Sequence, residues 1–428
     1  MKTIRINKVL RLQGTISVPA DKSITHRAIM LSSLADGRSI INNFLPSEDC
    51  FSTMNAFRNM GVEIEENGTT LIIKGVGIHG LKKPQQNIYA GNSGTTTRLI
   101  SGILAGQNFS STVTGDDSLS KRPMKRVIEP LKLMGTDITA KDGNFLPMTI
   151  NAKGNLKAVE YKSPVASAQV KSCILLAGLY ADGITKVTEP VKSRDHSERM
   201  LKAFGADISV DGLSVSIKHC DKLFAQNIDI PCDISSAAFF LVAGLIVPNS
   251  NIKILNVNIN STRDGIIEVL KNMGANITLD NVRTVSGEEV ADIEVSYSNL
   301  QAVDIGAEIM PRLIDEIPII ALAATQADGT TKISGAKELR VKESDRLSAI
   351  ATQLIKMGAD IVETEDGLII KGISKLNGCK VDSFKDHRIA MMLSIAGLIA
   401  EGETEIADSD CVNISFANFY EVLKKLNS

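Results

Sequence analysis

The chain repeats one pattern six times: an Ala-, Leu- and Ile-rich stretch that begins with polar residues and ends at a glycine or a similar helix breaker. Each stretch is apolar on most of its faces, which predicts a helix buried inside a domain. The first turn of such a helix presents unpaired N–H groups and a partial positive charge. We therefore predict that the polar openings line a site for anions. The stretches begin at Asp21, Gly91, Ser167, Asp233, Asp315 and Asp386.

A second repeat, a helix end followed by a β-hairpin, interleaves with the first. Its glycines recur at intervals of roughly 70 residues, which is too long for a solenoid. They suit left-handed helix caps, and the Asn-Gly or Asp-Gly pairs that follow suit tight turns between strands. The pattern predicts six units of two helices and several strands, split three and three. The glycines are Gly61, Gly135, Gly205, Gly274 and Gly358, with Asn427 in the sixth place.

Composition narrows the class of protein. A chain of 428 residues that is 43% hydrophobic can form two or three domains. The net charge of −2 argues against a nucleic-acid or membrane-surface protein, and the absence of Trp removes stacking platforms. The six cysteines show no metal-ligand spacing, and no apolar run is long enough for a signal peptide or a membrane span. We expect a soluble cytoplasmic protein.

The first two polar openings each have a structural alternative. Lys22, Ser23 and Arg27 could grip a phosphate, because Ser23 and Arg27 are about one helical turn apart and share a face. The alternative is a helix cap with surface cations. In GNSGTTTR, from Gly91, glycines allow a close backbone approach and Asn and Thr side chains could bind an anion. A plain turn before a helix explains this segment equally well.

Two charged runs are also candidates. In LSKRPMKRVIEPL, Arg122 precedes a predicted helix and can point towards a site, whereas its neighbours are expected to be solvated. In RVKESDR, Lys342 and Arg346 would share a face if the segment were helical. Exposed ion pairs are the alternative there. If all the openings face one cleft, its cations suit two small anions, with Asp315 and Glu343 as candidates for proton transfer.

The order of these motifs resembles that of the 5-enolpyruvylshikimate-3-phosphate synthase family from about Lys8 to the end of the chain. DKSITHR, GNSGTTTR, Arg-Pro-Met, SAQ, DEIP, RVKESDR and DHRIAM stand in the family's order. The SAQ and SRDHSER versions are similar to the branch called class II.

The resemblance implies a two-domain, inside-out α/β barrel of six βαβαββ repeats, three per domain. Domain I would comprise residues 1–20 and 232–428, and domain II would comprise residues 21–231. The active site would lie in the cleft between them.

The resemblance also implies a reaction. The enolpyruvyl group of phosphoenolpyruvate would pass to the 5-hydroxyl of shikimate 3-phosphate by addition and elimination, releasing phosphate, as a step of aromatic amino acid biosynthesis. No metal or organic cofactor, nucleic acid or membrane is implied, and we expect a monomer.

Site residues follow from the motifs by the same resemblance. Asp315 would take the hydroxyl proton, and Glu343 and Lys22 would share the remaining proton transfers. Shikimate 3-phosphate would be bound by Lys22, Ser23, Arg27, Ser167, Ala168, Gln169, Arg194, Asp315 and Lys342. Phosphoenolpyruvate would be bound by Lys22, Asn92, Gly94, Thr95, Arg122, Gln169, Arg346, His387 and Arg388.

Two positions depart from the pattern: Ile414 stands where some family members have a lysine, and Ala168 replaces a serine. One alternative function is that of the related enolpyruvyl transferase acting on UDP-N-acetylglucosamine. That family uses a loop cysteine, but the matching loop, GDDSLSKRPM, has none. The other alternative is a non-catalytic repeat scaffold, which would tolerate alanine at Arg122.

Overall fold

A computed structural model describes residues 2–427 of the chain. Contacts between Cα atoms divide it into two compact units. Unit 1 comprises Met1–Pro19, Pro231–Thr284 and Glu289–Ser428, and unit 2 comprises Ala20–Ile230 and Val285–Glu288.

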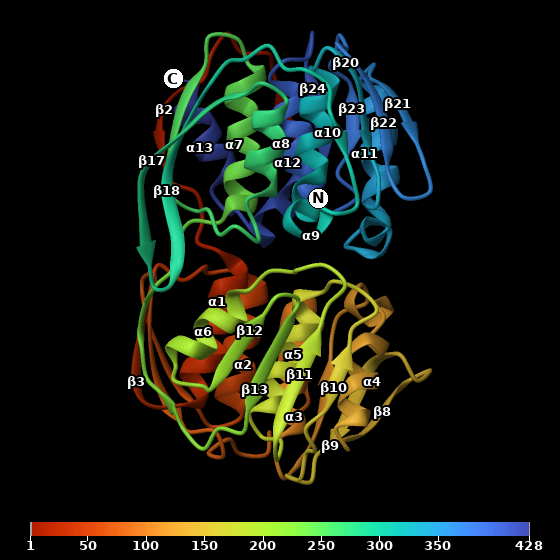
Figure 1. Cartoon of the computed structure of the whole chain (residues 1–428). Helices are drawn as coiled ribbons and strands as arrows, with labels where there is room; N and C mark the ends of the chain where they lie inside the picture. The colour runs from red at the N-terminus through yellow and green to blue at the C-terminus, as the bar shows by residue number, and fades with distance from the viewer. Residues whose placement is uncertain (1, 428) are drawn as a thin grey trace. The chain divides into compact units, whose positions relative to one another are not determined.

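Unit 2 alternates helices and strands along the chain (Figure 1). Its helices are α1 (Lys22–Leu34), α2 (Glu48–Asn59), α3 (Gly94–Ala105), η1 (Leu119–Lys121), α4 (Lys125–Leu133), α5 (Ala168–Gly178) and α6 (His196–Ala203). Its strands are β3 (Ala35–Asn42), β4 (Glu63–Asn67), β5 (Thr70–Val76), β6 (Ile88–Tyr89), β7 (Ser110–Thr114), β8 (Asp137–Lys141), β9 (Phe145–Asn151), β10 (Glu160–Lys162), β11 (Ile184–Thr188), β12 (Ile208–Asp211), β13 (Ser214–Lys218), β14 (Leu223–Phe224) and β15 (Asn227–Asp229).

Unit 1 has the same alternation. Its helices are α7 (Ile234–Ile246), α8 (Gly265–Asn272), α9 (Met310–Leu313), η2 (Ile314–Glu316), α10 (Ile317–Thr325), η3 (Lys337–Val341), α11 (Arg346–Lys356), α12 (His387–Gly397), η4 (Ser409–Ile414) and α13 (Phe419–Leu426). Its strands are β1 (Ile4–Ile6), β2 (Gln13–Ile16), β16 (Asn251–Asn258), β17 (Asn276–Val285), β18 (Glu288–Ser296), β19 (Asp304–Ile305), β20 (Gly329–Ile333), β21 (Asp360–Glu363), β22 (Leu368–Gly372), β23 (Lys380–Asp382) and β24 (Thr404–Ala407).

Within residues 2–427 the strands form six small mixed sheets, one for each repeat. In each sheet a parallel pair is extended by an antiparallel strand. In the second repeat, for example, β6 pairs in parallel with β7, and β7 pairs antiparallel with β9. A buried helix connects the two parallel strands, as a crossover connection requires. The predicted α/β fold of six βαβαββ repeats is therefore confirmed.

The apolar helices of each unit lie inside it, as predicted. In unit 1, α7, α10 and α12 contact one another (Figure 1), and every residue of α7 is buried. In unit 2, α3 contacts both α1 and α5. Gly102 allows the close approach of α3 to α5, because a Cβ atom there would lie 2.1 Å from the carbonyl oxygen of Cys173. The sheets then cover a shared helical core, which buries apolar surface on all sides of these helices.

Strands distant in the sequence complete the sheets of both units. In unit 1, β1 pairs antiparallel with β24, and β2 pairs in parallel with β16. In unit 2, β14 and β15 pair in parallel with β3. Strands from one end of each unit therefore cover sheet edges that would otherwise expose unpaired backbone groups.

The helix ends of the second repeat match the prediction at the five glycines. Their φ angles lie between 84° at Gly274 and 103° at Gly358, in the left-handed region that glycine favours. Asn427 differs, because it is the cap residue of α13 itself and has a φ of −94°. Across the part of the chain that the structure describes, helices lack the combined length and hydropathy needed to cross a bilayer.

Candidate functional site in two clusters

In unit 2, the start of α1 holds a cation beside a carboxylate. The Asp21 side chain caps the helix by accepting from the backbone N–H of Ile24 at 2.9 Å. Lys22 follows directly, and its Nζ lies 3.0 Å from Oδ2 of Asp49 on α2. Both side chains are partly buried, so their charges are poorly screened by water. This pair presents a charged amine and a neighbouring carboxylate at the opening predicted to bind anions.

Arg27 lies one turn further along α1 and is almost wholly buried. It donates to Ser23 O at 2.9 Å, to Ser197 Oγ at 2.7 Å and to Ser172 Oγ at 2.9 Å, which fixes the guanidinium plane. Burial, with a smaller contribution from the charge of Arg194, lowers the pKa of Arg27 to about 10, although the carboxylates of Glu198 and Asp21 oppose this shift. Arg27 remains protonated at neutral pH, and the charge of Arg194 is near enough to act on it. Two arginines from α1 and from the segment before α6 therefore combine their charges.

The GNSG loop and Arg122 form a second part of the unit 2 cluster. Arg122 Nη2 donates to Asn92 Oδ1 at 2.6 Å, and Nη1 donates to the Asn92 carbonyl at 3.3 Å. Asn92 Nδ2 in turn donates to Asp116 Oδ2 at 2.8 Å. A Cβ atom on Gly94 would lie 3.0 Å from Nη1 of Arg98 and 3.7 Å from Nη1 of Arg122. Glycine at 94 therefore keeps the space beside two guanidinium groups open.

Gln169 connects the starts of α3 and α5. Its Nε2 donates to Thr95 Oγ1 at 3.0 Å, and its Oε1 accepts from Arg98 Nη1 at 2.6 Å. Ser167 caps α5 by accepting from Val170 N–H, and Ala168 is the first residue of that helix. Arg98 thus orients the side chain of Gln169, a predicted substrate-binding residue.

A buried chain of hydroxyl groups runs from His26 to the cap of α3. His26 Nδ1 lies 2.7 Å from Thr53 Oγ1, and Thr53 Oγ1 lies 2.7 Å from Thr96 Oγ1. Thr96 donates to Oγ of Ser93, the N-cap of α3, at 2.7 Å. Burial lowers the pKa of His26 from 6.5 to about 3, so the imidazole is neutral at physiological pH. His26 is therefore a hydrogen-bonded structural histidine.

The neutral imidazole of His26 predicts a loss of stability in acid. The unfolded chain binds a proton below pH 6.5, whereas the folded protein binds it only near pH 3. The free energy of unfolding therefore falls as pH drops through this window, by about 2 kcal/mol between pH 7.5 and pH 5. Urea unfolding at both pH values measures the loss. In His26→Asn, which cannot titrate, the loss should be smaller by that amount; an equal loss would contradict the assignment.

In unit 1, Asp315 lies among cations from two other segments. Its Oδ1 is 3.4 Å from Lys342 Nζ and 3.5 Å from Arg346 Nη1. Its backbone carbonyl accepts from Arg388 Nη1 at 3.0 Å. Asp315 itself belongs to η2, which precedes the apolar helix α10. The predicted base thus shares a partly buried cluster with three predicted binding residues.

Arg346 anchors this cluster and is fully buried. Its Nε donates to Asp386 Oδ2 at 2.8 Å, and its Nη2 donates to Glu343 Oε2 at 2.7 Å. Burial lowers the pKa of Arg346, but Asp386, Glu343 and Asp315 together raise it above its usual value. Burial disfavours the charged form of Asp386 as well and so raises its pKa, but Arg346 and His387 hold this pKa below its usual value. Both groups therefore stay charged, and Asp386, the N-cap of α12, fixes Arg346 beside Asp315.

One predicted geometry in this cluster is wrong. Lys342 does not share a helix face with Arg346, because Lys342 has an extended backbone after η3. Asp345 caps α11 by accepting from Ser348 N–H, so the helix begins only at Arg346. The two cations converge through Asp315 instead. His387, the first residue of α12, is buried and lies between Asp386 and Arg388 in the sequence.

Several residues that position the side chains of the two clusters were not predicted from the sequence. Asp49 lies within α2 and Asp386 opens α12, and neither was predicted to contact a site cation. Asp386 carried a local signal, because an N-cap aspartate precedes His387 and Arg388. Asp49 carried none, since its contact with Lys22 spans two helices. Ile414, at the position of a lysine in some relatives, packs against the hydrophobic core of unit 1.

Comparisons of this chain with known protein families, sequences and solved structures agree on its family and its fold. Residues 6–423 match the family model described as EPSP synthase (3-phosphoshikimate 1-carboxyvinyltransferase). A 3-phosphoshikimate 1-carboxyvinyltransferase of Endomicrobium trichonymphae is 60% identical over 428 residues, covering 99% of each chain. One from Thermoanaerobacter sp. strain X514 is 53% identical and covers 99% of this chain and 100% of its own. A solved EPSP synthase structure from Acinetobacter baumannii aligns with a TM-score of 0.89 at 45% identity, covering 100% of this chain and 98% of that one.

Fold and sequence together define a two-part α/β transferase with the inside-out barrel architecture. The chain belongs to the EPSP synthase (3-phosphoshikimate 1-carboxyvinyltransferase) family. The family and the 3-phosphoshikimate 1-carboxyvinyltransferase activity predicted from the motifs are thereby confirmed. Both alternatives, the UDP-N-acetylglucosamine transferase and the scaffold, are set aside by the full-length match.

Proposed function

We propose that residues of both clusters contribute to this activity, the transfer of the enolpyruvyl group of phosphoenolpyruvate to the 5-hydroxyl of shikimate 3-phosphate in the shikimate pathway. The observation that carries the proposal is the position of Asp315, a carboxylate within 3.5 Å of two cations. Such a group can accept a hydroxyl proton while the cations bind the anionic substrates.

Shikimate 3-phosphate is bound by the arginine pair and the helix caps of unit 2, with help from unit 1. Arg27 and Arg194 supply the charges that a phosphate requires, and Arg27 is held rigidly by three serines. Ser23, Ser167, Ala168 and Gln169 line the neighbouring helix starts. Lys342 and Asp315 approach the hydroxyl that reacts. Buried, prealigned donors support this assignment because they lose little entropy when the ligand binds.

Phosphoenolpyruvate is bound by arginines of both clusters. Arg122 is aligned by Asn92, and Gly94 leaves space beside it. Thr95 and Gln169 add neutral donors, and Lys22 contacts both substrates. Arg346, His387 and Arg388 supply the charges from unit 1. Arginine forks match carboxylate and phosphate oxygens in pairs, which supports the choice of these residues.

The proton transfers divide between carboxylates and a lysine. Asp315 removes the proton from the 5-hydroxyl as oxygen attacks the central carbon of phosphoenolpyruvate. Glu343 and Lys22 move a proton to and from the methylene carbon. The tetrahedral adduct then loses phosphate and a proton, which restores the double bond. Cations fixed around the adduct stabilise charge that develops on its phosphate and carboxylate groups.

Phosphate release from phosphoenolpyruvate tests the reaction. We expect release with shikimate 3-phosphate, without added metal, and none with UDP-N-acetylglucosamine. Release only with the nucleotide sugar would overturn the proposed substrate.

The protein acts as a cytoplasmic monomer. Six free cysteines, most of them buried, are compatible with a reducing compartment. Light scattering tests the oligomeric state, where a mass near 46.0 kDa is expected. Fractionation of the source cells tests the compartment.

A further inference from the structure

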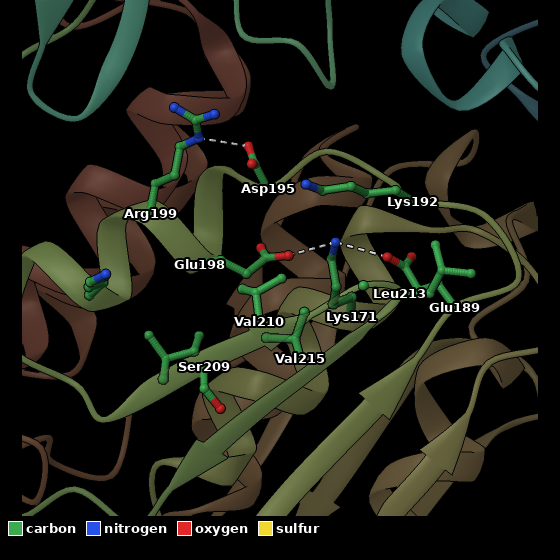
Figure 2. Close-up of a pocket in the computed structure, with 13 residues that line it drawn as sticks. Lys171, Glu189, Lys192, Asp195, Glu198, Arg199, Ser209, Val210, Leu213 and Val215 are labelled. Atoms are coloured by element: carbon green, nitrogen blue, oxygen red, sulfur yellow. Dashed lines mark hydrogen bonds and ion pairs between the residues drawn. The ribbon is translucent and has the colours of Figure 1, made fainter.

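A buried cluster of charges in unit 2 lies outside the residues assigned above. Lys171 Nζ, on α5, lies 2.8 Å from Glu189 Oε2 and 2.7 Å from Glu198 Oε1, on α6. Each of the three side chains is no more than 5% exposed. Figure 2 shows Lys171 between the two carboxylates at one side of a pocket of about 490 Å³. A cluster this buried is costly to form, so its contacts with the backbone decide what it can do.

The two glutamates differ in what else they contact. Glu189 Oε1 accepts from the backbone N–H of Ser167 at 3.1 Å, and Oε2 accepts from that of Ser193 at 3.3 Å. Lys171 adds a hydrogen bond to the Ser193 carbonyl at 3.4 Å. Glu198 bonds Lys171 through Oε1, whereas its Oε2 has no hydrogen-bond partner among the described residues. Of the two glutamates, only Glu189 therefore binds the backbone at or next to assigned substrate residues.

We propose that Lys171 and Glu189 are positioning residues for shikimate 3-phosphate: they hold the cap Ser167 and the segment Ser193–Arg194 in their binding positions. This inference rests on the proposed roles of Ser167 and Arg194. One carboxylate bonds both segments, so a change at Glu189 moves two binding groups at once. Charge-assisted hydrogen bonds of this kind are stronger than neutral ones, which suits them to fixing a backbone. Glu198 balances the charge of Lys171 without contacting either segment.

The charge of Lys171 is stable around neutral pH. Burial alone would lower the pKa of Lys171, but Glu198 and Glu189 raise it above its usual value. The ammonium group therefore remains protonated and keeps its hydrogen bonds throughout the pH range of an ordinary assay.

Glu189→Gln and Glu198→Gln form a matched pair for the test. A glutamine at 189 accepts only one of the two backbone N–H groups, and its amide NH₂ opposes the other. A glutamine at 198 keeps its oxygen on Lys171 and places NH₂ where Oε2 had no partner. We expect the KM for shikimate 3-phosphate to rise about tenfold or more in Glu189→Gln with a smaller change in kcat. In Glu198→Gln the KM should stay within about twofold, because the glutamine oxygen keeps the hydrogen bond to Lys171 and the hydrogen bonds of Glu189 to the two segments remain.

Arg194→Ala serves as the reference, and melting temperatures report on folding. A general structural role predicts equal effects of the two glutamine variants on KM, which would overturn the inference. A large effect of Arg194→Ala without an effect of Glu189→Gln would overturn the positioning role alone. An unchanged KM in Arg194→Ala would overturn the assignment of Arg194 and, with it, the inference.

Chemical rescue gives a second test should Glu189→Gln fail to fold. Lys171→Ala removes an ammonium group that borders the pocket, so an alkylammonium ion can enter the space. We expect propylammonium to lower the raised KM of Lys171→Ala for shikimate 3-phosphate most of the way to the wild-type value. It should have no effect on Lys171→Met, in which the space stays filled. Equal responses of these two variants would contradict the role of the Lys171 charge.

Discussion

Asp315→Asn should lower kcat by about 10²- to 10⁴-fold, because asparagine keeps the shape of the side chain but cannot accept a proton. The dissociation constants of the two substrates should stay the same or fall. Asp315 partly neutralises Lys342 and Arg346, so removing its charge leaves more positive potential for anions. We expect both substrates to bind as tightly as before, or more tightly. Steady-state kinetics and calorimetric titration measure the two effects separately.

Asp345→Asn is the matched control for this substitution. Asp345 is an exposed aspartate in the same segment as Lys342, and its side chain caps α11. Asparagine caps helices as well as aspartate does, so kcat should be retained. A kcat within threefold of the wild type in Asp315→Asn would remove Asp315 as the base and leave Glu343 and Lys22 as the candidates.

Arg122→Ala should lower kcat/KM for phosphoenolpyruvate by about 10²- to 10³-fold. The guanidinium is aligned by two hydrogen bonds to Asn92 and by Ser118 Oγ at 3.3 Å. These hydrogen bonds hold the guanidinium in a fixed orientation before any substrate binds. Arg122→Lys should recover only part of the loss, because an ammonium cannot form the paired hydrogen bonds of a guanidinium.

Lys121→Ala removes an equal charge from the adjacent, exposed position and serves as the control. Its effect on kcat/KM should be within about twofold, since exposed charges are well screened. Equal losses in the two alanine variants would indicate a general electrostatic effect rather than a contact with the substrate.

Much of this fold was predictable because its repeats are visible in both helix and turn residues. The length and composition of the apolar stretches predicted the buried helices, and the regular spacing of the glycines predicted the helix caps. Loop geometry was less accessible. The departure of Lys342 from the α11 helix depends on the cap formed by Asp345, a choice that helical spacing alone does not reveal.

Side-chain contacts across repeats were the least predictable part of the site. The contact between Lys22 and Asp49 joins two helices, and Arg346 with Asp386 joins two repeats. Glu189 lies outside every motif, yet it bonds the backbone of two segments that carry predicted binding residues. Such contacts depend on how the helices pack. A single sequence shows which residues lie at the helix starts but not which of these starts come together.

The pairing of β1 and β2 with β24 and β16 sets an order of events during synthesis on the ribosome. Unit 2, apart from Val285–Glu288, is continuous in sequence and can begin to fold once residue 230 has emerged. β1, by contrast, must wait for β24 at Thr404–Ala407, which is synthesised long after β1. Until then its edges are open to other nascent chains. The cations at Lys2, Arg5, Lys8 and Arg11 discourage such pairing, so the charge of this N-terminal segment protects the chain while it is being made.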